Sequence, residues 1–173
     1  LLLVKDHAEG MDSEAMVEGI AKYGEYTSGD SGRGIFGMGL KDTINVFGSG
    51  IILSIKDEKL YTCELQDLDE LKLHAPETVN AQTRKRCGIS SNGTLALINI
   101  SDPKVRIPQY DTLRKSIQTH VCLRLIMADP KRTVVIKDGR TGATDTLSYQ
   151  YPEHEILVDK DITIKDYPGV NAH

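Results

Sequence analysis

The first hundred residues alternate between continuous apolar runs and apolar positions spaced three or four residues apart. The first pattern predicts strands and the second predicts helices. Residues 66–92 have a weaker pattern, which indicates a helix or loop and a further strand. This order predicts an α/β two-layer sandwich with a mixed sheet and helices on one face. The predicted strands cover 1–5, 51–56, 59–65 and 94–100, and the predicted helices cover 13–23, capped by Asp12, and 36–47, ended by Gly48.

The pattern changes after Ser101-Asp102-Pro103. Apolar residues at helical spacing predict a helix over 111–127, with Asp111 as its cap and Asp129-Pro130 as its end. Strand-like runs follow at 133–137, 146–151 and 155–164, separated by glycines and a proline. We therefore expect a first domain at 1–101 and part of a second at 102–173.

The composition is that of an ordinary globular chain, with 39% hydrophobic and 27% charged residues. No apolar run approaches the roughly 20 residues that cross a bilayer, so we expect no membrane association. Cys63, Cys87 and Cys122 are widely spaced, which favours reduced thiols in an intracellular protein, cytoplasmic or nuclear, over a disulfide set or a metal site. A net charge of −4 argues against a chain that coats nucleic acid by itself, although local binding stays open.

Glycines at positions 34, 37 and 39 directly precede the second predicted helix. Without Cβ atoms they let backbone amides approach a polyanion, and a helix N-terminus favours negative charge. The segment therefore predicts a phosphate cradle, with a ligand-free connector as the alternative. Gly32–Gly37 also reads G-x-G-x-x-G, the fingerprint of dinucleotide-binding oxidoreductases, but loop-forming residues stand where that fingerprint needs a buried strand.

Asp6 stands just past the end of the first apolar run, which is consistent with a buried strand. A carboxylate only accepts hydrogen bonds, so Asp6 can take an amino hydrogen of adenine and would reject a guanine carbonyl at the same place. Thr94 begins the strand predicted at 94–100, where an ordinary strand start would look the same.

Taken together, Asp6–Met11, Gly34–Lys41 and Gly93-Thr94 resemble the GHKL superfamily of ATPases, which includes gyrase, heat-shock chaperones, histidine kinases and MutL. The likeness covers about residues 1–100 and is closest in look to the MORC-like and MutL-like branch. It implies a Bergerat-type fold that binds ATP, hydrolyses it slowly, closes a lid and forms a homodimer. Ala8 departs from the family's middle glycine. The resemblance assigns Asp6, Gly10 and Thr94 to the adenine base and Gly34, Gly37 and Gly39 to the phosphates. The other residues that it assigns to the nucleotide are Met11, Phe36, Met38, Leu40 and Lys41.

In this family a helix before the aspartate strand carries a glutamate that activates water and an asparagine that binds Mg²⁺. The chain begins inside the strand, so we expect these groups upstream, and the catalytic residues are unknown. Residues 102–173 resemble the beginning of a transducer domain. The alternatives are a non-catalytic interaction module with a vestigial nucleotide pocket and a dinucleotide-binding oxidoreductase.

Overall fold

The computed structural model of the chain describes residues 1–21, 39–67, 70–151, 162–163 and 171–172. The chain divides into two compact units, 1–106 and 107–173. The sequence predicted the boundary five residues earlier. In the described parts of the chain, no helix is both long and apolar enough to cross a bilayer.

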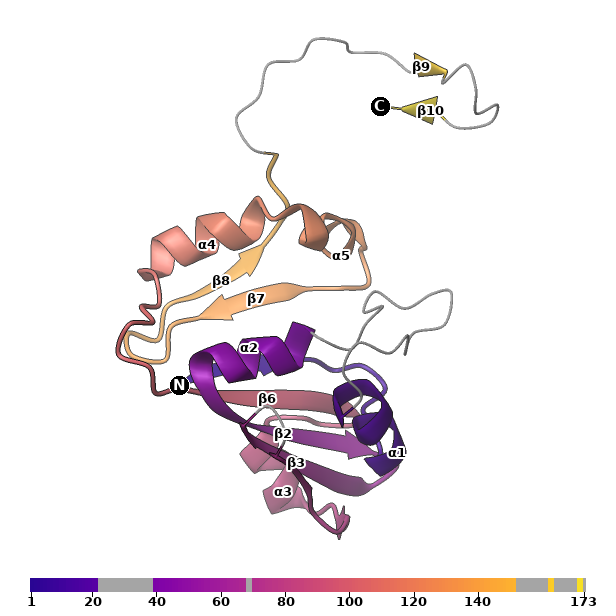
Figure 1. Cartoon of the computed structure of the whole chain (residues 1–173). Helices are drawn as coiled ribbons and strands as arrows, with labels where there is room; N and C mark the ends of the chain where they lie inside the picture. The colour runs from indigo at the N-terminus through magenta and orange to yellow at the C-terminus, as the bar shows by residue number, and fades with distance from the viewer. Residues whose placement is uncertain (22–38, 68–69, 152–161, 164–170, 173) are drawn as a thin grey trace. The chain divides into compact units, whose positions relative to one another are not determined.

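The first unit is built on one sheet, in which the strands lie in the order β1-β6-β2-β3-β4 and β5 pairs with β3 (Figure 1). All described strand pairs in it are antiparallel, so the predicted mixed sheet is wrong for this part of the chain. The link between β2 and β3 shows why. Asp57 and Glu58 both adopt left-handed φ angles, 49° and 61°, and form a tight two-residue turn that sends the chain straight back. The strands are β1 (Leu2–Lys5), β2 (Gly48–Lys56), β3 (Lys59–Asp67), β4 (Glu70–Leu73), β5 (Glu77–Thr78) and β6 (Gly93–Ile100).

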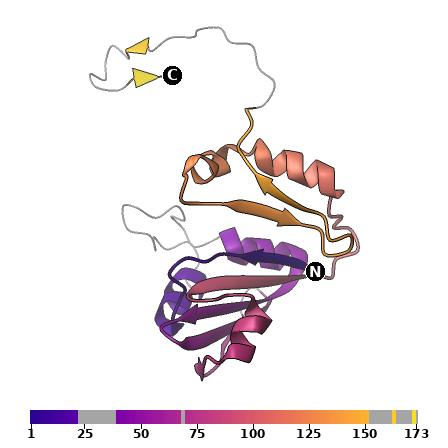
Figure 2. The ribbon, with the colours of Figure 1, turned by 180° about the vertical axis from the view of Figure 1, so that it is seen from behind.

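Helices cover both faces of this sheet, whereas the sequence predicted helices on one face. The short helix α1 (Ser13–Met16), its π-helical continuation η1 (Val17–Ala21) and α2 (Gly39–Phe47) pack on one face, where Met16, Ile44 and Ile52 share a core. Helix α3 (Ala81–Cys87) covers the opposite face (Figure 2), and its Cys87 belongs to a second core with Ile55. Ile52 and Ile55 lie three positions apart on β2, so they point to opposite faces.

Strand β1 differs from its prediction as well. It is an edge strand that pairs only with β6 among the described strands, and Leu3 and Val4 are each 56% exposed. The apolar run 1–4 predicted a buried strand. Composition alone predicts an apolar strand but does not reveal how many neighbours it finds in the sheet.

The described residues of the second unit form helical elements and small antiparallel strand pairs. The predicted helix 111–127 is interrupted near Thr119, whose hydroxyl bonds back to the carbonyl of Lys115 at 3.0 Å. Asp111 lies in the first turn rather than at the cap, which is Gln109 without a side-chain bond. Much of the strand predicted at 155–164 lies outside the described residues. The elements are α4 (Tyr110–Gln118), η2 (Val121–Leu123), α5 (Arg124–Ala128), β7 (Val134–Lys137) paired with β8 (Thr144–Leu147), and β9 (Ile162–Thr163) paired with β10 (Asn171–Ala172).

Candidate functional site

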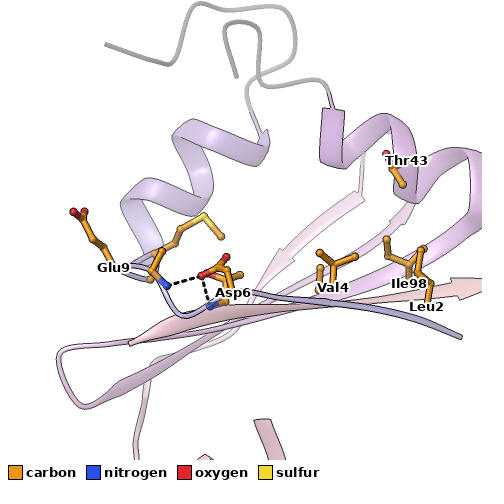
Figure 3. A pocket seen from close by; sticks show the side chains of 11 residues that line it. Leu2, Val4, Asp6, Glu9, Thr43 and Ile98 are labelled. Carbon is orange, nitrogen blue, oxygen red and sulfur yellow. Dashed lines mark hydrogen bonds between the residues drawn. The ribbon is translucent and has the colours of Figure 1, made fainter. Parts of the chain in front are cut away.

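A cavity of about 670 Å³ lies on the α2 side of the sheet edge formed by β1 and β6 (Figure 3). Its volume is in the range of small-molecule sites. Four residues that the family resemblance assigned to the nucleotide line it: Asp6, Gly10, Met11 and Thr94. The full lining is Leu2, Val4, Asp6, Ala8, Glu9, Gly10, Met11, Thr43, Thr94, Ala96 and Ile98.

The alternation of the two strands explains this lining. Every second residue of a strand points to the same face. The register pairs Leu2 with Ile98 and Val4 with Ala96. Both pairs therefore face the cavity and form an apolar floor, and Asp6 and Thr94 continue the two strands at its polar end.

Asp6 is held by three short interactions. Its amide donates to the carbonyl of Thr94 at 2.9 Å. One carboxylate oxygen, Oδ1, accepts from the amides of Ala8 at 3.0 Å and Thr94 at 3.2 Å. The other oxygen, Oδ2, has no hydrogen-bond partner among the residues that the structure describes. One oxygen thus builds the site, and the other can accept a hydrogen bond from a ligand.

The turn after Asp6 depends on Gly10, whose φ is +75°. A Cβ added there would stand 2.2 Å from the carbonyl oxygen of Ile55. The left-handed residue of this turn is Gly10 and not Ala8, which explains how alanine can stand where the family has its middle glycine. Close contact with β2 therefore requires glycine at position 10.

Sequence reasoning missed Ser54, a fully buried hydroxyl on β2. Its Oγ accepts from the amide of Met11 at 2.6 Å. It also lies 3.2 Å from the carbonyl oxygen of Gly93 and 3.2 Å from Oγ1 of Thr94. Ser54 thus joins the two polar segments of the site. The signal for it was a single polar residue inside the apolar run 51–55.

A second polar link fixes the start of α1. The Asp12 side chain accepts from the amide of Ala15 at 2.9 Å, as the sequence predicted, and its other oxygen pairs with Lys56 at 2.7 Å. The hydrogen bond from Ala15, followed by that from Lys56, lowers the pKa of Asp12 below its ordinary value of 3.8. These contacts anchor the segment that follows Gly10 and Met11.

The predicted phosphate segment is described only in part. Gly39, Leu40 and Lys41 form the first turn of α2, and Thr43, one turn further on, lines the cavity. The helix that contributes Thr43 to the cavity therefore begins with three residues of the predicted phosphate segment. Gly34, Phe36, Gly37 and Met38 lie outside the described residues.

The cavity is lined mainly by apolar side chains. It combines these apolar walls with a few polar groups at one end, the usual make-up of a small-molecule site. No group of three or more metal-ligating side chains occurs within the described residues.

Comparison with known proteins gives no family for this chain. No model of a known protein family matches it, and no curated protein matches it as a relative.

Proposed function

We propose that the first unit binds an adenine nucleotide in the cavity beside β1, β6 and α2. The observation that carries the proposal is Asp6, whose Oδ1 is held by two backbone amides while Oδ2 keeps its acceptor capacity. A carboxylate fixed in this way loses little freedom when a ligand binds, which favours affinity. Its acceptor oxygen matches the amino group of adenine.

The base would lie over the apolar floor formed by β1 and β6. The Leu2–Ile98 and Val4–Ala96 pairs supply a flat apolar surface, and Met11 supplies a flexible side chain at its border. Met adapts its shape to aromatic rings and contacts them favourably. Asp6 and Thr94 would then recognise the polar edge of the base.

The phosphates would extend toward the N-terminus of α2. Unpaired amides at a helix start attract anions, and glycine permits close approach of a phosphate. Gly34, Gly37 and Gly39 would form this cradle, with Phe36, Met38 and Leu40 in the lid, and Lys41 would offset phosphate charge. The family resemblance implies Mg²⁺ as a cofactor and assigns none of these residues as its ligand.

Within a longer protein, we propose that this unit couples ATP binding and slow hydrolysis to lid closure and to dimerisation, as in GHKL-type ATPases. The residues after Arg106 would transmit the change. Three segments of the chain resemble motifs of that family and occur in the same order, which supports this reading. The cavity that gathers Asp6, Gly10 and Thr94 supports it independently. We place such a protein inside the cell.

The oxidoreductase reading fits the described sheet poorly. Its fingerprint belongs to parallel β-α-β units. Here β2, the strand that follows α2, is antiparallel to both of its neighbours. The other alternative is a non-catalytic interaction module with a vestigial pocket. Measured nucleotide affinity separates that module from the proposed function.

Titration calorimetry of the 1–173 chain with ATP, with adenosine and with NAD tests the proposal. We expect ATP to bind, adenosine to bind more weakly and NAD to bind poorly. Absence of ATP and adenosine binding in a chain that is folded by circular dichroism would contradict the proposal. A clear preference for NAD would restore the oxidoreductase reading.

A further inference from the structure

We infer that Ser54, acting through Thr94, is a specificity-determining residue: it leaves the Thr94 hydroxyl, like Asp6 Oδ2, able only to accept hydrogen bonds from a ligand at the polar end of the cavity. The inference rests on the proposed function, from which it takes the class of ligand, a nucleotide. It concerns which edge of a base the site prefers. Ser54 does not line the cavity, so its role is to position another group.

The argument begins with the capacity of one hydroxyl. Serine has one O–H hydrogen and two acceptor positions. The amide of Met11 occupies one acceptor position of Ser54 at 2.6 Å. Two oxygens remain nearby, the carbonyl of Gly93 and the hydroxyl of Thr94, both at 3.2 Å.

A carbonyl oxygen can only accept, so it decides the direction of both bonds. If Ser54 donates to Gly93, then Thr94 can donate its own hydrogen to the second acceptor position of Ser54, and all three contacts are hydrogen bonds. If Ser54 donates to Thr94 instead, its oxygen faces the Gly93 carbonyl at 3.2 Å with no hydrogen between them. The first arrangement satisfies each buried group, which is what protein interiors require.

The consequence concerns the cavity. Thr94 lines it, and its only hydroxyl hydrogen is engaged by Ser54, so Thr94 Oγ1 can only accept from a ligand. Asp6 Oδ2, a second side-chain polar atom at this end, is a carboxylate oxygen and also only accepts. An amino group, whose two hydrogens need acceptors, is therefore favoured. A carbonyl in the same place would meet oxygen lone pairs.

ATP and inosine triphosphate test this directly, because the second carries a carbonyl oxygen where the first carries the amino group. We expect the wild-type chain to bind ATP at least about tenfold more tightly. Ser54→Ala frees the Thr94 hydrogen to donate to a carbonyl, so we expect the ratio of the two affinities to fall about fivefold. A purely structural role would lower both affinities together and leave the ratio unchanged.

Two further variants isolate the pathway through Thr94. In a Thr94→Val background no hydroxyl can reorient, so adding Ser54→Ala should leave the ratio unchanged. Ser49→Ala is the matched control, since Ser49 is the second residue of the same strand, pairs with Asn99 and does not line the cavity. If Ser54→Ala fails to fold, Ser54→Cys keeps a side chain of similar shape with weak hydrogen bonding and should lower the ratio in the same direction.

The outcomes separate the two proposals. A wild-type preference for ATP that Ser54→Ala or Ser54→Cys leaves intact overturns the role of Ser54 alone. Equal binding of both nucleotides by the wild type also overturns it, while nucleotide binding itself stands. Binding of neither nucleotide by a folded wild-type chain overturns the proposed function, and the role of Ser54 falls with it.

Discussion

Asp6 and Thr94, 88 residues apart in sequence, are joined through both main chain and side chain. The amide of Asp6 donates to the Thr94 carbonyl at 2.9 Å, and the Asp6 carboxylate accepts from the Thr94 amide at 3.2 Å. The carboxylate is therefore held in place by the sheet itself. This arrangement makes the orientation of Asp6 independent of any ligand and leads to the first prediction.

Asp6→Asn should weaken ATP binding roughly 10- to 150-fold. The oxygen of asparagine can keep the bonds to the amides of Ala8 and Thr94, while its NH₂ group replaces Oδ2 and presents a donor to the donor of adenine. Calorimetry with ATP measures the loss. Asp6→Ala is the comparison, because it also removes the two amide contacts and should lower thermal stability. ATP affinity that is unchanged in Asp6→Asn would remove Asp6 from the base site.

Gly10→Ala should destabilise the first unit by about 2 to 5 kcal/mol, because it adds left-handed strain and a steric clash with Ile55. Gly88→Ala is the matched control. Gly88 also has a left-handed φ, +63°, but its nearest obstacle is the flexible end of Lys5 at 3.0 Å. We expect it to cost only about 1 to 2 kcal/mol. Urea unfolding measures both, and equal costs would mean that the close approach to Ile55 is not important.

Gly37→Val should lower ATP affinity while the fold survives, because a branched Cβ would stand where backbone amides should meet phosphate. Adenosine, which has no phosphate, should be affected less. Calorimetry with both ligands on wild type and variant gives the comparison. A variant that binds ATP as well as the wild type does would make this segment a connector.

The stability of the first unit should depend on pH through Asp12. Because its hydrogen bonds lower its folded pKa, Asp12 contributes stability above the ordinary pKa of 3.8, and this contribution is lost as the pH falls through the lowered value. Asp12→Asn can still cap α1 but cannot titrate. Urea unfolding between pH 7 and pH 3 should therefore show a smaller acid loss in Asp12→Asn. Equal loss in both proteins would mean that other carboxylates account for it.

The three cysteines should react very differently with a thiol reagent. Cys63 is fully buried, and burial raises its pKa to about 11, whereas Cys122 is exposed. The thiolate is the reactive form, so at pH 8 we expect Cys63 to react at least about a hundredfold more slowly than Cys122. Absorbance with a disulfide reagent, with and without urea, gives both rates, and Cys122→Ser identifies the fast site. Fast reaction of all three native thiols would contradict the buried core described here.

The order of the elements in the first unit followed from the sequence, because the relevant signals are local. Apolar spacing predicted α2 and strands β2, β3 and β6, and a single aspartate before the helical pattern predicted the Asp12 cap. The pairing of the strands did not follow. Direction, edge position and the number of covered faces depend on which segments meet, so the mixed sheet and the buried first strand were wrong.

The same division holds for the site. The sequence by itself identified Asp6 as a candidate, because acceptor chemistry is a property of a single residue, and the family resemblance added Gly10, Met11 and Thr94. Only the tertiary structure decided that they share a cavity, that one oxygen of Asp6 is engaged by Thr94, and that Ser54 is hydrogen-bonded to both sides. The sequence shows Ser54 as a single polar residue in an apolar run, but it does not show which groups the hydroxyl contacts. Its role depends on three partners that the antiparallel register brings within hydrogen-bonding distance, and register is a property of the whole sheet.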